Sequence, residues 1–279
     1  MPKYFQPRTP IRFESSDGEI VATFPRGEFE YEAEQSYRDA YSDIAGAGYA
    51  FRHAGTGLAP KGVGRERLRF MIQEATPQAV DATFDDLKSR CRRAGLGKLF
   101  TQDVNGNERW AWAASAETPR LRWRAGDIFR QAVSLDFTRT SDWFGDLETD
   151  SVTISATPAT FTLHNPGNAP VRAIVFRFRS SATNGFTNPS LTNDTNDYEF
   201  SSTRDGTTAN HELRVDTETG EVEFSTNDGA DYTNDLDNFS RGSAQVDYMI
   251  LEPGDNEFEY VDGGTPDLDI DYEFYPAYE

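Results

Sequence analysis

The chain has 279 residues, a formal net charge of −20 at pH 7, a hydrophobic share of 37% and an aromatic share of 13%. Its length predicts two domains of ordinary size, and its aromatic residues suffice to build their cores, so a wholly disordered chain is excluded. Neither a run of eighteen apolar residues nor a signal-peptide layout is present, and we expect a soluble chain made in the cytosol. The single cysteine, Cys91, excludes an intramolecular disulfide framework and a zinc site built on several thiolates.

The charge is divided unevenly along the chain. Residues 1–145 contain 21 basic and 20 acidic residues, whereas residues 146–279 contain 6 and 27. All four tryptophans and all four lysines lie in the first part. We therefore expect two domains, 1–145 and 146–279. The acidity of the second argues against a general nucleic-acid-binding surface, and it is typical both of adaptation to very high salt and of ordinary acidic proteins.

The first 75 residues contain segments with the two-residue period of half-buried strands. Ile20, Ala22 and Phe24 are expected on one face of such a strand, with Val21 and Thr23 on the other. Residues 28–34 alternate in the same way. Within residues 65–72, the expected inner face consists of Leu68, Phe70 and Ile72.

A helix is predicted over about 76–94. Thr76 is a suitable N-cap, Pro77 suits the first helical position, and Gly95 suits the end. The apolar stripe of this helix consists of Val80, Phe84, Leu87 and Cys91. Its periodicity predicts that it packs on a sheet.

Strands resume after the helix. Residues 98–103 and 108–114 flank Asn105-Gly106, a pair that favours a hairpin turn, and residues 121–123 and 128–137 form a further strand pair. The first domain is thus predicted to be mainly β, a β-sandwich with one α-helix.

The second part shows short alternating segments and almost no helical period. Ile174, Phe176 and Phe178 are expected on one strand face, and residues 213–215 return through 222–224 as a hairpin. The last strand, 267–274, alternates acidic residues with apolar ones. An antiparallel β-sandwich follows, with one face of its strands in solvent.

Candidate catalytic groups are few. The three histidines, His53, His164 and His211, lie in expected loops or at strand ends, and we interpret them as structural or solvent-facing. Cys91 lies on the apolar stripe of the helix and is expected to be a small core residue. The 47 acidic residues offer many carboxylate pairs without a distinguishing spacing. We therefore expect no enzyme, and we assign no catalytic, cofactor or metal site.

Two segments were weighed as ligand sites. Asp228, Asp231, Asp235 and Asp237, with Asn227 and Asn234, are able to ligate a hard cation such as calcium, but they lack EF-hand spacing, and a flexible acidic loop is the alternative. Gly55, Gly57, Gly62 and Gly64 lie among Lys61 and Arg65 without a phosphate-loop fingerprint, so a long connection is expected there.

Basic residues gather in two places. Arg65, Arg67 and Arg69 share one strand face, and Arg90, Arg92 and Arg93 crowd the end of the predicted helix, where cations complement the helix dipole. Either group is expected to meet a neighbour's carboxylates or to be a solvated face, and the sequence leaves both readings open.

The order of motifs over residues 120–279 resembles a known family. These motifs are the passage from Phe129 through Phe137 to Trp143-Phe144, the turn-bearing segment 163–171, the pair 215–217 and 220–222, the segment 251–256, and the aromatic ending 271–276. In this order they are similar to the distal tail protein (Dit) of long-tailed, non-contractile viruses, siphoviruses, in which it joins the tail tube to the tail tip or baseplate.

The resemblance implies an N-terminal domain related to tail-tube proteins that assembles as a hexameric ring, and a C-terminal galectin-like sandwich. The implied partners are further copies of the chain, the tail-tube protein, and the tip, hub and tape-measure proteins. DNA makes only transient contact as it passes through the lumen, no membrane partner is implied, and the location is the virion tail tip after assembly in the host cytoplasm. The galectin sugar site is not carried over, because residues 146–279 lack tryptophan. The alternative is a carbohydrate-binding host-adhesion module, and a halophilic host would account for the acidity.

Overall fold

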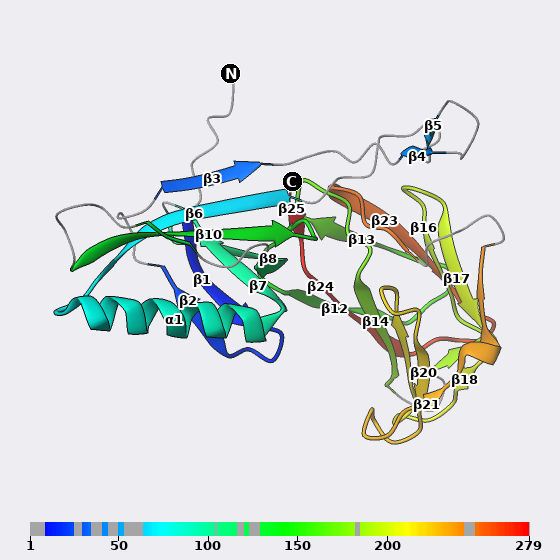
Figure 1. Ribbon diagram of the computed structural model, residues 1–279. Coiled ribbons are helices and arrows are strands. Elements are labelled where there is room, and N and C mark those ends of the chain that lie inside the picture. Colours follow the sequence, from blue (N-terminus) through cyan, green and yellow to red (C-terminus); the bar gives the residue numbers. More distant parts are fainter. Residues whose placement is uncertain are drawn as a thin grey trace. The chain divides into compact units, whose positions relative to one another are not determined.

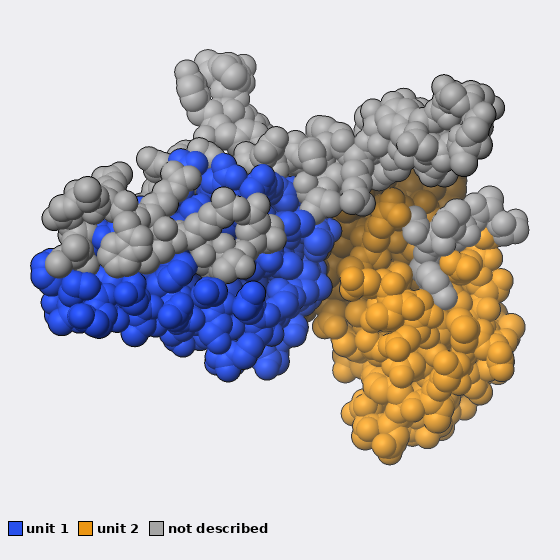
Figure 2. Space-filling model, viewed as in Figure 1, with its two compact units in different colours: residues 1–143 blue, residues 144–279 orange. Residues whose placement is uncertain are grey.

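The computed structural model describes residues 9–24, 30–34, 41–43, 50–52, 64–103, 105–115, 120–122, 129–181, 185–242 and 249–278. The chain divides into two compact units, residues 1–143 and 144–279, which Figure 2 shows in different colours. This division lies close to the change in charge and composition along the sequence. Each unit has its own hydrophobic core.

The first unit is built around one large antiparallel sheet (Figure 1). The strands of the first unit are β1 (Thr9–Ser15), β2 (Ile20–Thr23), β3 (Glu30–Glu34), β4 (Tyr41–Asp43), β5 (Ala50–Arg52), β6 (Gly64–Gln73), β7 (Leu96–Gln102), β8 (Glu108–Ser115), β9 (Arg120–Arg122) and β10 (Arg130–Arg139). The sheet has the order β2-β1-β7-β8-β10-β6-β3, β9 also pairs with β10, and β4 pairs with β5. The next strand, β11 (Trp143–Phe144), lies at the division between the units.

Helix α1 (Pro77–Ala94) begins and ends where the sequence predicts. The hydroxyl of Thr76 accepts a hydrogen bond from the backbone N–H of Ala79 at 3.1 Å, and Gly95 after the last turn has a φ of 59°. Val80, Leu87 and Cys91 are buried. The predicted apolar stripe therefore packs against the sheet, along one face of which α1 runs in Figure 1.

The hairpin between β7 and β8 is confirmed, but Asp103 organises its loop rather than the Asn-Gly pair alone. The Asp103 carboxylate accepts hydrogen bonds from the N–H groups of Asn105 and Asn107, both at 2.9 Å. Gly106 supplies the positive φ, 93°. The last cross-strand pair before the loop is Gln102 with Glu108.

The predicted inner face of β6 is confirmed, and that of residues 20–24 is confirmed for Ala22 and Phe24 but wrong for Ile20 and Val21. Ile20 is 53% exposed, and Val21 is buried beside Ala22. The register between β1 and β2 shifts at Phe13 and Glu14, which inserts an extra residue and breaks the alternation. Val21 consequently turns toward α1, where it lines a cleft with residues of that helix.

The second unit consists of two facing antiparallel sheets. Its elements are β12 (Glu148–Ile154), β13 (Ala159–Asn165), β14 (Ile174–Ser180), β15 (Phe186–Thr187), β16 (Ser190–Asn193), β17 (Tyr198–Ser202), β18 (Asp205–Gly206), β19 (Glu212–Asp216), β20 (Val222–Ser225), β21 (Thr233–Asn234), the 3-10 helix η1 (Leu236–Asn238), β22 (Phe239–Arg241), β23 (Gly254–Val261), β24 (Leu268–Phe274) and β25 (Ala277–Tyr278). One sheet has the order β12-β24-β14-β19-β20-β21 and the other β13-β23-β16-β17-β22. Both are visible in Figure 1.

The core between these sheets is aromatic, as the composition predicts. Phe176 and Phe178 of β14 are fully buried and lie against Phe200, Phe258 and Tyr260 of the opposite sheet. Along β14 and β24 buried and partly exposed residues alternate, so one face of these strands meets solvent. The sandwich predicted for the second part is confirmed.

The turn after β13 belongs to the segment 163–171 singled out in the sequence. Asn165 is 1% exposed; its amide donates to the carbonyl of Ala169 at 3.1 Å and its Oδ1 accepts from Gly167 N–H at 2.9 Å. A Cβ on Gly167 would lie 2.2 Å from the carbonyl oxygen of Ala277. The close approach of the C-terminal strand therefore requires glycine.

The fold class predicted from the sequence, mainly β with one helix in the first unit, is confirmed. Within the described residues α1 is the one α-helix. The finer expectation of a galectin-like topology remains a prediction.

Candidate functional site

The sheet of the first unit has an outer face, meaning the side of β1, β7, β8, β10 and β6 that points away from the core. Arg12, Lys98 and Trp112 lie on this face because they alternate with buried residues such as Phe13 and Leu99. On β1, β7 and β8 this face presents Arg12, Lys98, Phe100, Trp110 and Trp112. Aromatic residues and arginine are enriched at protein–protein interfaces, so this face is the first candidate site.

Two cations of the outer face lie over aromatic rings. The Arg12 guanidinium is 3.7 Å from the Phe100 ring centroid, and Lys98 Nζ is 4.4 Å from the Trp110 ring centroid and 5.5 Å from that of Trp112. The two tryptophans contact each other edge to face at 5.6 Å. These cation–π contacts hold flexible side chains flat against the sheet, which reduces the entropy that a partner would lose on binding.

Arg12 also joins β1 to β8 through carboxylates. Its Nε is 2.5 Å from Glu14 of the same strand, and its Nη1 is 2.7 Å from Glu108 of β8. Partial burial lowers the pKa of Arg12, but the hydrogen bonds to Glu14 and Glu108 outweigh it and the pKa is raised. The guanidinium is therefore a fixed positive charge.

Arg65 and Arg67 contact a carboxylate within their own chain, so neither alternative left open by the sequence describes these two residues. Arg67 Nε donates to Asp136 Oδ1 at 2.7 Å, and Arg65 Nη2 lies 3.5 Å from the other Asp136 oxygen. On the opposite side of β6, Glu30, Glu32 and Glu34 of β3 are in register with Arg69, Arg67 and Arg65. This register places β3 and β10 on the two sides of β6.

A buried ion pair escaped the sequence analysis. Arg139 Nε donates to Glu66 Oε1 at 2.9 Å, and the two side chains are 6% and 1% exposed. Arg139 also donates to the carbonyl of Ser141 at 2.6 Å and lies over the Trp143 ring. A Cβ on Gly64 would be 2.9 Å from Arg139 Nε, so the glycine leaves room for the guanidinium. The burial of Glu66 could have been recognised in the sequence, because Glu66 is two residues before Leu68 and shares the inner face of β6 with it.

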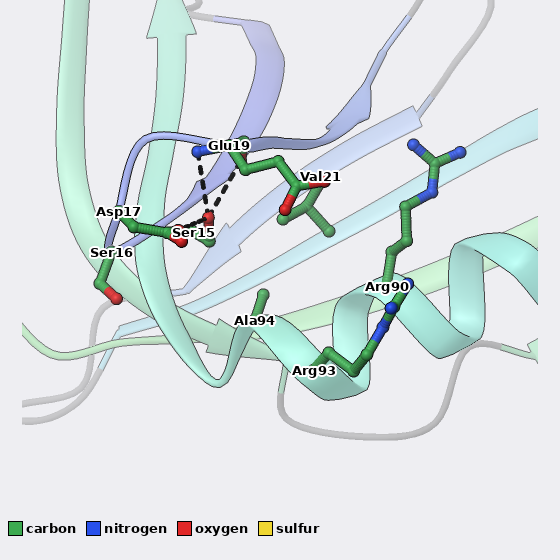
Figure 3. Close-up of a pocket in the computed structure, with 8 residues that line it drawn as sticks. All are labelled: Ser15, Ser16, Asp17, Glu19, Val21, Arg90, Arg93 and Ala94. Carbon is green, nitrogen blue, oxygen red and sulfur yellow. Dashed lines mark hydrogen bonds between the residues drawn. The ribbon is translucent and has the colours of Figure 1, made fainter.

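The C-terminal end of α1 borders a cleft of about 280 Å³. Figure 3 shows Arg90 and Arg93 on the helix side, with Asp17 and Glu19 on the β1–β2 hairpin and Val21 between them. The hairpin holds itself together, since the Ser15 hydroxyl bonds the Asp17 carboxylate and the backbone of Glu19. The hydrogen bond from Ser15 lowers the pKa of Asp17. The cleft thus has a cationic wall and an anionic wall.

The basic residues of this helix end differ in their pairing. Arg90 is bonded to Asp86 one turn earlier. Among the cationic side chains that the structure describes, Arg92 and Arg93 are the two that make no ion pair, hydrogen bond or ring contact. Both are exposed in the last turn of α1.

In the second unit, four of the six arginines lie on carboxylates of the same unit. Arg177 and Arg179 of β14 contact Glu273 and Asp271 of β24 at 2.8 and 2.5 Å, and Arg214 contacts Glu223 at 2.7 Å. The hydrogen bond to Glu273 raises the pKa of Arg177. With the cations engaged inside the unit, its surplus of carboxylates is left to face solvent.

The acidic segment 227–237 is ordered by its own side chains. Asp235 is 2% exposed and binds Arg204, with Nε to Oδ2 at 3.0 Å, and Asn238 donates to it at 2.7 Å. Asn227 Oδ1 accepts from the N–H of Asp231 at 2.9 Å. The expectation of a flexible acidic loop is therefore wrong for Asp235, which is a buried partner of arginine. No group of His, Cys, Asp and Glu suited to a metal ion is found among the described residues.

The other residues weighed in the sequence have structural surroundings or lie outside the description. His164 Nδ1 is 2.6 Å from Asp255 on the exposed face of β13 and β23, and His211 packs edge to face on Phe224. Cys91 is buried, and burial raises the pKa of its thiol to about 11. His53, Gly55, Gly57, Lys61 and Gly62 lie outside the described residues. None of the described helices has the length and apolar character that a membrane span requires.

No protein-family model and no curated protein matches the sequence. Two solved structures are similar over nearly the whole chain. The crystal structure of the Dit protein (gp 19.1) of phage SPP1, described as a paradigm of hub adsorption apparatus in phages that infect Gram-positive hosts, has 13% identity and a TM-score of 0.60, and the match covers 95% of this chain and 98% of that one. The baseplate of phage p2 in its activated conformation with Sr has 9% identity, a TM-score of 0.47 and coverage of 95% and 98%. The first likeness shows that the chain has the fold of the SPP1 Dit protein through both units.

Proposed function

We propose that this chain is a structural protein of a virus tail, a distal tail protein of the kind found in siphoviruses. The observation that carries the proposal is the match to the SPP1 Dit fold over 95% of the chain, including both units and their order. Because one fold can host many functions, the proposal also draws on the charge distribution and on the surfaces described above.

The first unit is the part that associates with its copies, in a hexameric ring. Its net charge is close to zero, and its outer sheet face holds aromatic rings and ordered cations of the kind that interfaces use. A closed ring needs a heterologous interface, in which two different patches of each copy meet. The second unit, with 6 basic and 27 acidic residues beyond position 145, repels its copies and stays in solvent.

In this role the ring joins the tail tube to the tip or baseplate, and its partners are the tail-tube protein and the hub and tape-measure proteins. DNA passes through the lumen with weak, transient contacts, since tight phosphate binding requires clustered cations. The role is that of a virion component rather than an enzyme.

Negative-stain images of the purified full-length protein test the proposal. We expect rings with six-fold symmetry, and sedimentation should give the mass of six copies of the 31.3 kDa chain. Particles that remain single at every protein concentration and salt concentration, or turnover of a small molecule, would refute it.

Carbohydrate binding by the second unit remains a prediction. Glycan-array binding by the full chain would support it, and the assembly role does not depend on the result.

A further inference from the structure

The exposed face of α1 carries two charge patches of opposite sign. Toward its start, Asp81 and Asp85 are exposed one turn apart; Asp81 has no partner among the described residues, and the Asp85 carboxylate is 4.0 Å from Lys88. In the last turn, Arg92 and Arg93 are exposed and unpaired, as described above. From Asp81 to Arg92 the helix rises about 16 Å. We call Asp81 with Asp85 the acidic patch and Arg92 with Arg93 the basic patch.

This arrangement is unusual within this molecule. Elsewhere the described arginines and lysines lie on carboxylates, on aromatic rings or in other contacts of the same chain. Arg93 lines the same cleft as Asp17 and Glu19 but makes no ion pair with either. Asp81, Arg92 and Arg93 are therefore charges without an ion pair among the described residues, and Asp85 has only the 4.0 Å contact with Lys88.

Apolar side chains next to the basic patch add the contact area that ion pairs alone do not supply. Ile20, on the edge strand β2, and Leu96, just after the C-cap of α1, are 53% and 48% exposed. The cleft of about 280 Å³ opens between that hairpin and the helix end. Surface ion pairs contribute little when isolated, whereas ion pairs beside desolvated apolar groups contribute more.

We propose that the basic patch of α1 binds the acidic patch of α1 on a second copy of this chain. Each copy carries both patches, and they are separate and opposite in sign. The basic patch of one copy can therefore meet the acidic patch of the next copy in a head-to-tail, heterologous contact. This inference rests on the proposed ring and names the surface through which copies meet.

Sedimentation velocity of the full-length protein over a range of concentrations gives the first test. The double variant Arg92→Gln with Arg93→Gln removes two charges, and we expect it to weaken association about tenfold, or threefold for each ion pair lost. The matched control is Gln73→Glu with Asn105→Asp, which changes the net charge by the same amount at two exposed positions outside α1. It should associate like the wild type. Circular dichroism verifies that both variants are folded.

A charge swap is the decisive test. Arg92→Asp with Arg93→Asp makes both patches acidic, and Asp81→Arg with Asp85→Arg makes both patches basic. Each variant alone should associate at least tenfold more weakly than the wild type, and an equimolar mixture of the two should recover association, an outcome that misfolding or general charge repulsion does not produce.

The outcomes separate the two proposals. Two results would overturn the α1 contact and leave the ring proposal intact. In the first, the wild type assembles and the glutamine variant associates as strongly as its control. In the second, the mixture of the two charge-swapped variants fails to associate. Wild-type protein that is monomeric throughout overturns both.

Discussion

The buried ion pair between Glu66 and Arg139 makes a sharp energetic prediction. Substituting Glu66→Gln keeps the shape of the side chain and removes its charge, so the guanidinium of Arg139 remains buried without a counter-ion. Both side chains are nearly inaccessible, 1% and 6% exposed, and the N···O distance is 2.9 Å. Breaking a buried pair in this way costs about 3–5 kcal/mol. The hydrogen bond to Ser141 and the contact with Trp143 remain, but both groups are neutral.

The assay isolates the unit that contains the pair. All four tryptophans precede position 145, so tryptophan fluorescence during urea unfolding reports on the first unit. Glu108→Gln is the control, because Glu108 forms an ion pair with Arg12 at 2.7 Å but its side chain is 37% exposed. Its loss should cost less than about 1 kcal/mol. A Glu66→Gln loss as small as that of the control would refute the assignment of an uncompensated buried charge.

A compensated variant tests the same reasoning from the other side. Replacing Glu66 by Leu and Arg139 by Met removes both charges together, and we expect the unfolding free energy to stay within about 1–2 kcal/mol of the wild type or to rise. If the double variant is as unstable as Glu66→Gln, packing rather than charge sets the cost.

Three further predictions concern titration, charge and salt. Because burial raises the pKa of Cys91 from 9.0 to about 11, the stability contributed by its neutral thiol is fully present below pH 9 and is lost between pH 9 and 11. The loss is about 3 kcal/mol at most, and the difference in unfolding free energy between wild type and Cys91→Ala should shrink over that range. Arg204→Gln leaves Asp235 buried without its counter-ion and should cost the second unit about 3 kcal/mol, measured by circular dichroism, whereas a loss below 1 kcal/mol would contradict the pairing. Diluting sodium or potassium chloride should lower the melting temperature of the second unit because its carboxylates repel, and a melting temperature independent of salt would rule out salt adaptation.

Much of the fold was predictable because its elements have strong periods and distinct ends. Thr76 and Gly95 mark the ends of α1, and the alternation along β14 and β24 identifies the sandwich. The inner face of β2 was not predictable, because a one-residue register shift depends on the partner strand and leaves no pattern in residues 20–23. Sequence alternation describes a regular strand and says nothing of bulges.

The candidate surfaces were predictable only in part. The sequence placed Arg65, Arg67 and Arg69 on one face, but whether they are solvated or paired depends on which strands lie beside β6. Glu66 could have been recognised as buried from its phase, and Arg139 likewise from its phase with Phe137. Their pairing required knowing that β6 and β10 are neighbours, which is a long-range property.

The distribution of pairing explains why the first unit rather than the second is suited to bind copies. In the second unit the described arginines that form ion pairs do so inside the unit, so its remaining charge has one sign, and copies gain nothing by bringing it together. In the first unit the charges are nearly balanced in number but not in place, since α1 carries Asp81 and Asp85 toward its start and the unpaired Arg92 and Arg93 in its last turn. A neutral unit with separated patches of opposite charge attracts a suitably rotated copy of itself. A unit whose charges all have the same sign repels its copies in every orientation. In the proposed ring the free energy of assembly therefore comes from the first unit.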